Sequence, residues 1–306
     1  MLWTTIQEHT PLDWTLRVVG YIAIATLTLD LAVRYRIRDL YDGMTLMAIV
    51  GVLVSLFIKP DFSFTSFPVS LLTRVMGGHT LVMAEMFGLF IVLTAGNNRR
   101  YRGLLLAVAT WLGFYWGIWM RWNPALSGLF EPVGLVSALI YAAAFFAVPL
   151  VLWGIVTRIS TQHTPTDFTL SLAEWFVLVT VFLLLFMAQA LQNAVNVGAI
   201  VTSSLILLIC WSILWFRRSE IGTTLLDEHL PITPLDPRWL LGAVGLFVAV
   251  MLFAYHLPLV QLGAYNQLWL MEIGFGFVGT VWLPIVATVV SVRGVDYLMR
   301  TNKLSL

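Results

Sequence analysis

Long apolar runs separated by short polar segments dominate the sequence. Each run is close to the ~20 residues that an α-helix needs to cross the hydrocarbon core of a bilayer. The pattern therefore predicts an all-α, polytopic membrane protein with about nine transmembrane helices in a single transmembrane domain over residues 1–306. The predicted spans are residues 14–33, 40–58, 76–96, 103–120, 132–157, 168–190, 198–216, 239–260 and 268–292.

The composition agrees with this pattern and excludes several classes of function. Hydrophobic residues make up 59% of the 306 residues and charged residues only 11%, too few to cover a soluble domain with polar surface. The net charge of +1 and the lack of a basic stripe indicate that nucleic acid is not a partner. The single cysteine, Cys210, cannot form a disulfide framework or hold an iron–sulfur cluster, which needs several thiolates.

The distribution of basic residues predicts the orientation of the chain in the membrane. If the spans alternate in direction, one side carries Arg34, Arg36, Arg38, Arg99, Arg100, Arg102, Arg158, Arg217, Arg218, Arg238, Arg293, Arg300 and Lys303, whereas the other carries Arg17, Lys59, Arg74 and Arg121. Because cytoplasmic loops are enriched in Lys and Arg, we expect an external N-terminus and a cytoplasmic C-terminus. The expected location is the plasma (inner) membrane of a prokaryote, as a multi-pass protein.

One carboxylate lies deep within a predicted span. Glu85 stands in "MAEMFGLF", residues 83–90, about ten residues from the external end of the third span. An ionised carboxylate in hydrocarbon costs several kcal/mol, so Glu85 requires a proton, a buried partner or a functional cavity. We therefore take it as the candidate catalytic residue. Asp30 and Glu174 lie near cytoplasmic helix ends, where they can reach basic loops.

Further polar and aromatic residues gather in the outer half of the predicted bundle: His79, Tyr115, Trp119, Arg121, Glu131, His256 and Glu272. Each also has a structural interpretation. Tryptophans at helix ends belong to the interfacial belt, histidines bond within a core, and Glu131 before Pro132 fits a helix start. We predict no metal ligands among them.

Two stretches of the first half resemble a known family. They are "IKPDFSFTSFPVSLLTRVMGGHTLVMAEMFGLF" and "GFYWGIWMRWNPALSGLFEPVGLVSALIYAAAFF". Their order of features resembles the NrfD/DmsC-like membrane anchors of molybdopterin and iron–sulfur oxidoreductases. These features are a loop with proline and phenylalanine, a glutamate in the third span, aromatic residues at the end of the fourth span and a proline at the start of the fifth. The resemblance covers roughly residues 14–157. It departs at Lys59, near a position where some DmsC-type chains have a histidine.

The resemblance implies a function. Such anchors bind menaquinone or ubiquinone near the face that docks a ferredoxin-like iron–sulfur subunit, and a large molybdopterin-type subunit carries the terminal chemistry. The anchor exchanges electrons between the quinone pool and the partner, usually without a metal of its own. Glu85 would then take up the proton, Arg121 or His79 would hold the headgroup, and Tyr115 or Trp119 would pack against the ring. Glu131, His256 and Glu272 complete the candidate set.

Two other functions remain open on the residues alone. His79 and His256 lie at similar predicted depth and could ligate a haem b, which would make the chain a membrane cytochrome. Intramembrane carboxylates also couple protons to solute movement in secondary transporters. Transporters tend to have helices broken by Gly or Pro in paired halves, and Pro258 and Pro284 have no counterparts in the first half.

Overall fold

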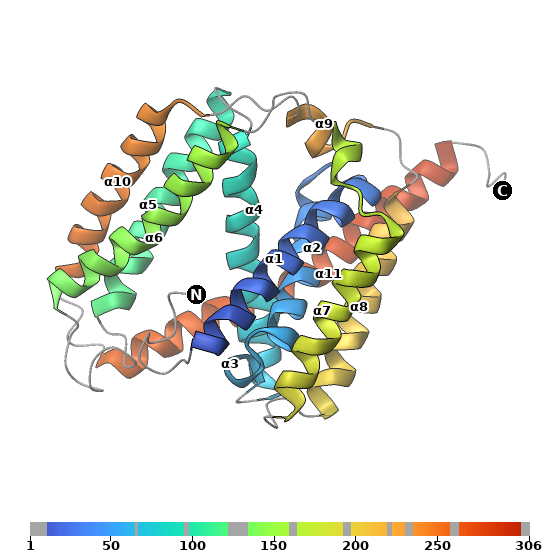
Figure 1. Cartoon of the computed structure of the whole chain (residues 1–306), viewed down its shortest axis with the longest axis horizontal. Helices are drawn as coiled ribbons and strands as arrows, with labels where there is room; N and C mark the ends of the chain where they lie inside the picture. Colours follow the sequence, from blue (N-terminus) through green and yellow to red (C-terminus); the bar gives the residue numbers. More distant parts are fainter. Residues whose placement is uncertain are drawn as a thin grey trace. The chain divides into compact units, whose positions relative to one another are not determined.

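A computed structural model describes residues 11–64, 67–94, 98–121, 134–158, 164–191, 197–218, 222–229, 235–257 and 263–300. Every regular element within these ranges is a helix (Figure 1). The helices are α1 (Pro11–Arg34), α2 (Leu40–Phe57), α3 (Pro60–Phe64), η2 (Leu71–His79), α4 (Thr80–Thr94), α5 (Arg99–Arg121), α6 (Leu135–Val156), η3 (Pro165–Phe168), α7 (Leu172–Leu191), α8 (Val197–Arg217), α9 (Leu225–His229), α10 (Pro237–Tyr255) and α11 (Gly263–Arg300).

Each of the nine predicted spans overlaps a helix in the described part of the chain. Seven helical stretches in the described part of the chain are long and apolar enough to cross a membrane: α1, α2, η2 with α4, α7, α8, α10, and residues 274–297 of α11. The chain is thus an all-helical, multi-pass membrane protein. The other two predicted spans correspond to α5 and α6, which have 23 and 22 residues but are not among these seven. The count of nine spans therefore stays a prediction, as does the orientation.

The chain divides into two compact units, which are described separately. Of the described residues, one unit contains those within 85–163 and 229–270, and the other contains those within 11–84, 164–228 and 271–300. We call them the α5/α10 unit and the α2/α8 unit. The prediction of one transmembrane domain over residues 1–306 stays a prediction.

The α5/α10 unit is built on the close packing of two helices. A Cβ at Gly113 of α5 would lie 2.6 Å from the carbonyl oxygen of Phe247 on α10, and a Cβ at Gly117 would lie 2.5 Å from that of Met251. Only glycine permits this close approach of the two helices. Ala138 and Ala142 of α6 are also buried in this core, at 0% and 2% exposed.

The α2/α8 unit surrounds α2, the most buried of the candidate spans. α2 packs against α1, η2, α7 and α8. η2 is a π-helix, and it approaches α11 so closely that a Cβ on Gly77 or Gly279 would collide with the carbonyl of Phe275 or Leu72. The Trp282 indole of α11 donates a hydrogen bond of 3.1 Å to the Met76 carbonyl. These contacts hold the first half of the third span against α11.

Asp30 and Glu174, the two acidic residues predicted near cytoplasmic helix ends, have different partners. Asp30 is fully buried and forms an ion pair of 2.9 Å with Arg34, and it also accepts a hydrogen bond of 2.8 Å from the Leu170 backbone. Glu174 bonds instead to the backbone and hydroxyl of Ser171, at the start of α7. Asp30 therefore finds a basic partner as predicted, whereas Glu174 caps its own helix.

Candidate functional site

Glu85 lies on the inward face of α4. It is four residues before Leu89 and seven before Val92, so the three side chains share one side of the helix. Leu89 and Val92 pack into the core of the α5/α10 unit, and Val92 is 2% exposed. The face of α4 that carries Glu85 is therefore the one from which Leu89 and Val92 pack into this core. Glu85 itself is half-buried.

Tyr115 of α5 lies within electrostatic range of the Glu85 carboxylate. Among the described residues, Glu85 makes no hydrogen bond and no ion pair. Beside Tyr115 in the sequence, Trp116 is 6% exposed and packs with its ring centroid 6.3 Å from that of Phe247. Two predicted site residues of the same unit, a carboxylate and a phenol, thus act on each other electrostatically.

Arg121 and His256 meet at one helix end in the same unit. The Arg121 guanidinium donates to the carbonyl oxygens of Tyr255 and Leu257, and it lies 5.4 Å from the centre of the Tyr255 ring. His256 is the C-cap of α10, and its Nδ1 lies 2.8 Å from the Leu252 carbonyl oxygen. A cation at the C-terminus of a helix is favoured by the helix dipole, so Arg121 closes α10 whether or not it also holds a ligand.

His79 belongs to the α2/α8 unit, where its Nε2 lies 3.1 Å from the hydroxyl of the fully buried Ser63. Nearby Lys59, between α2 and α3, is only 7% exposed, and burial lowers its pKa to about 8. Arg74 and Lys59 both act electrostatically on His79. His79 therefore sits in a basic environment and already has a hydroxyl partner.

Three predicted residues fall outside what the structure describes. Glu131 lies in residues 122–133, and the side chains of Trp119 and Glu272 are also outside the described part of their helices. Their predicted roles stay predictions. Within the described residues, no cluster of three or more His, Cys, Asp or Glu side chains could hold a metal ion.

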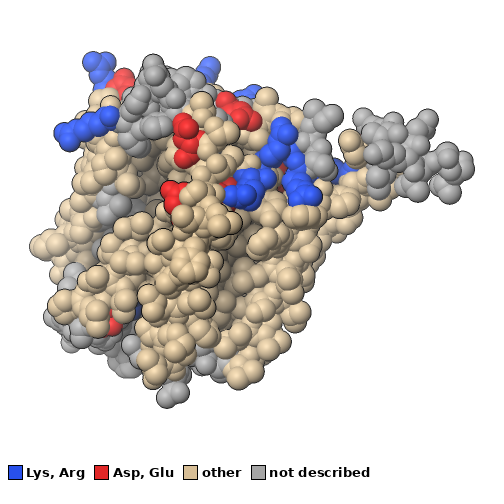
Figure 2. All heavy atoms as spheres, turned by 45° about the vertical axis from the view of Figure 1, so that its right-hand side comes forward, with Lys and Arg blue, Asp and Glu red and all other residues tan. Residues whose placement is uncertain are grey.

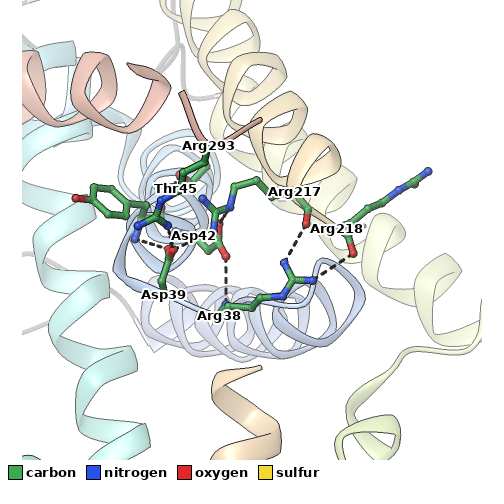
Figure 3. A network of polar contacts seen from close by, with 8 residues as sticks. Arg38, Asp39, Asp42, Thr45, Arg217, Arg218 and Arg293 are labelled. Carbon is green, nitrogen blue, oxygen red and sulfur yellow. Dashed lines mark hydrogen bonds and ion pairs between the residues drawn. The ribbon is translucent and has the colours of Figure 1, made fainter. Parts of the chain in front are cut away.

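Sequence reasoning missed a buried ionic network in the α2/α8 unit (Figure 3). Arg217, at the end of α8, is 2% exposed and pairs with Asp42 at 2.5 Å and with Asp39 at 2.9 Å. Arg293 of α11 also pairs with Asp39, and the Arg38 backbone N–H donates to Asp42. The network therefore joins the start of α2 to α8 and α11, which are distant in sequence.

Asp39 also begins α2. Its carboxylate accepts hydrogen bonds from the backbone N–H groups of Tyr41 and Asp42, as an N-cap residue does. Burial alone would raise the pKa of Asp39, but these N–H groups together with Arg217 and Arg293 hold that pKa below its usual value. The signal in the sequence was the pair of aspartates in "RDLYDG" at the start of a span. It was obscured because Arg217 was taken as a loop residue.

No family model matches the sequence, and neither the curated proteins nor the solved structures give a significant match.

Proposed function

We propose that the protein is the quinone- or quinol-binding membrane anchor of a respiratory oxidoreductase, with its site beside Glu85 in the α5/α10 unit. The observation that carries the proposal is Glu85 itself: a half-buried carboxylate with no ion-pair partner among the described residues, within electrostatic range of the Tyr115 phenol. Oxidation of a quinol releases two protons and two electrons, so the site needs a group that accepts a proton within the apolar protein.

The division of roles follows from the chemistry of the two side chains. Glu85 accepts a proton from the quinol hydroxyl or returns it to the quinone oxygen. The Tyr115 hydroxyl donates a hydrogen bond to a quinone oxygen, and its ring packs against the headgroup. Arg121, six residues further along α5, supplies positive charge toward the predicted external end of the helix. The predicted role of His79, which belongs to the α2/α8 unit, stays a prediction.

The electrons pass to a ferredoxin-like iron–sulfur subunit, and a large molybdopterin-type subunit uses them. This part of the proposal rests on the family resemblance and on the single cysteine, which leaves the chain unable to hold a cluster by itself. The proposed topology has nine spans, an external N-terminus and a cytoplasmic C-terminus in a prokaryotic plasma membrane.

Photolabelling tests the binding site directly. A photoreactive menaquinone or ubiquinone analogue added to the purified protein should label peptides of α4 and α5, and excess unmodified quinone should compete. Tyr115→Leu should weaken labelling, whereas the control Phe114→Leu, on the partly lipid-exposed face of the same helix, should not. Labelling confined to other helices, or labelling that quinone does not displace, would reject the site.

A proton-coupled transporter is the second candidate, favoured by one observation. The third span is irregular, because the π-helix Leu71–His79 precedes the α-helix from Thr80, and non-α segments within spans are common at transport sites. Solute-dependent proton uptake by vesicles that contain only this chain would favour that function over the anchor.

A further inference from the structure

One side of α8 presents a continuous apolar stripe. Val201, Leu205 and Leu208 follow at spacings of four and three, and they are 52%, 54% and 63% exposed. Trp211 and Trp215 continue toward the end of the helix and are 50% and 52% exposed. The stripe therefore runs along the span and ends in two tryptophans, the residues that prefer the interface between hydrocarbon and water.

Arg218 follows the stripe at the helix end. Its guanidinium carbon lies 3.2 Å from the centre of the Trp215 ring, and the side chain is exposed. Figure 3 shows this side chain pointing away from the network around Asp39 and Asp42. Among the described residues, no carboxylate forms an ion pair with Arg218.

Two further arginines bond to the backbone at the end of α8 and just after it. Arg38 donates to the carbonyl oxygens of Arg217 and Arg218, at 2.9 Å and 3.4 Å. Arg36, which is exposed, donates to the carbonyl of Gly222 at 3.1 Å. Because the Arg36 bond goes to a carbonyl oxygen rather than a carboxylate, it does not neutralise the positive charge of Arg36. Charged groups also gather in one part of the face drawn in Figure 2, beside a broad area that carries none.

We propose that this end of α8 binds the headgroup phosphate of an anionic phospholipid, with an acyl chain lying along the Val201–Leu208 stripe. We call it the α8 lipid site and define it by Arg36, Trp211, Trp215 and Arg218. The charge of the headgroup complements Arg36 and Arg218. The tryptophans occupy the level of the glycerol backbone, and the stripe continues into the hydrocarbon.

The apolar parts of the site distinguish a lipid from a free anion. A small phosphate would gain from the arginines but would leave the exposed half of each indole ring and the stripe uncovered. A zwitterionic lipid would cover the stripe, but its headgroup carries no net charge for the arginines to favour. Only an anionic phospholipid uses all three features, so the site discriminates between lipids rather than binding them uniformly.

The test compares lipid binding by the full chain in its purified form. The protein is placed in bilayers of phosphatidylcholine with a minor share of phosphatidylglycerol, and the phosphatidylglycerol retained on extraction is measured. Arg218→Gln should lower this enrichment about fivefold, as expected for one cation at a headgroup, and Arg36→Gln should lower it less. Arg218→Lys should retain most of it because it keeps the positive charge, and an unchanged unfolding temperature in detergent should show that each variant folds.

A matched control distinguishes a specific lipid site from general electrostatic attraction to anionic lipid. Arg158→Gln removes an exposed arginine that follows α6 in the other unit, and it should leave the enrichment unchanged. An equal loss in Arg158→Gln would show diffuse attraction and overturn the proposal. Displacement of the lipid by inorganic phosphate or glycerol 3-phosphate would show a free-anion site instead, and an unchanged enrichment in Arg218→Gln would reject the site outright.

Discussion

Two carboxylates within predicted spans are held in different ways, and the difference assigns them different roles. Asp42 is 1% exposed and its charge is matched by Arg217, which is itself 2% exposed. Glu85 lies within electrostatic range of a tyrosine, and no described cation pairs with it. A matched ion pair keeps its charge and favours one structure, whereas an unmatched carboxylate can change protonation at low cost. We therefore interpret Asp42 as structural and Glu85 as reactive.

Removal of Arg217 should destabilise the protein strongly. Arg217→Met leaves Asp39 and Asp42 without their shared cation, and breaking a buried pair in this way costs about 3–5 kcal/mol. Thermal unfolding in detergent measures the loss. Arg293→Gln removes a cation that is 47% exposed and should cost about 1 kcal/mol or less. Equal stability of the two variants would contradict the structural role of the network.

Lys59 should make stability depend on pH in the alkaline range. Burial lowers its pKa in the folded protein to about 8, below its usual 10.5, so the folded state loses the proton first. The cost of burying the charge is therefore fully present below about pH 8 and disappears as the pH rises toward 10.5. Lys59→Met should raise the unfolding temperature at pH 7 and by less at pH 10. A gain that does not change with pH would contradict the burial of the charged amine.

At the scale of elements, the apolar pattern predicted where helices lie but not how they are built. Each predicted span is a helix because runs of about 20 apolar residues carry enough signal by themselves. The π-helix Leu71–His79 was not predicted, since it depends on contacts with α11, some 200 residues away. The ionic network was missed for the same reason, because Asp42 meets Arg217 only in the folded protein. The Glu85 environment was anticipated in part, because a lone carboxylate in an apolar run is visible locally.

The contact between η2 and α11 should tolerate no side chain at Gly279. Gly279→Ala places a methyl group against the Leu72 carbonyl, so the helices must separate, and we expect a loss of about 1–3 kcal/mol. Gly274→Ala on the same helix meets nothing within 4 Å and should be neutral or slightly stabilising. Thermal unfolding of the pair tests the packing, and a neutral Gly279→Ala would contradict it.

At the scale of the whole molecule, the proposed orientation can be tested by labelling. Cys210 is fully buried, so a cysteine introduced at an exposed position should be the reactive thiol. A cysteine at Gly134, before α6, should react with a membrane-impermeant reagent in intact cells. A cysteine at Asn98, before α5, should react only after the membrane is opened. Reversed accessibility would invert the orientation, and labelling of both positions in intact cells would contradict α5 as a span.

The central claim is that Glu85 carries the proton in quinone chemistry, and turnover per assembled complex tests it most directly. Glu85→Gln keeps the size of the side chain but cannot take up the proton, so quinol oxidation should fall at least about tenfold, a loss of roughly 1.4 kcal/mol of transition-state stabilisation. Assembly and thermal stability should stay unchanged. Glu174→Gln, the same change at an exposed carboxylate, should leave turnover intact. Normal turnover per complex in Glu85→Gln, with or without a loss of folded protein, would contradict the account.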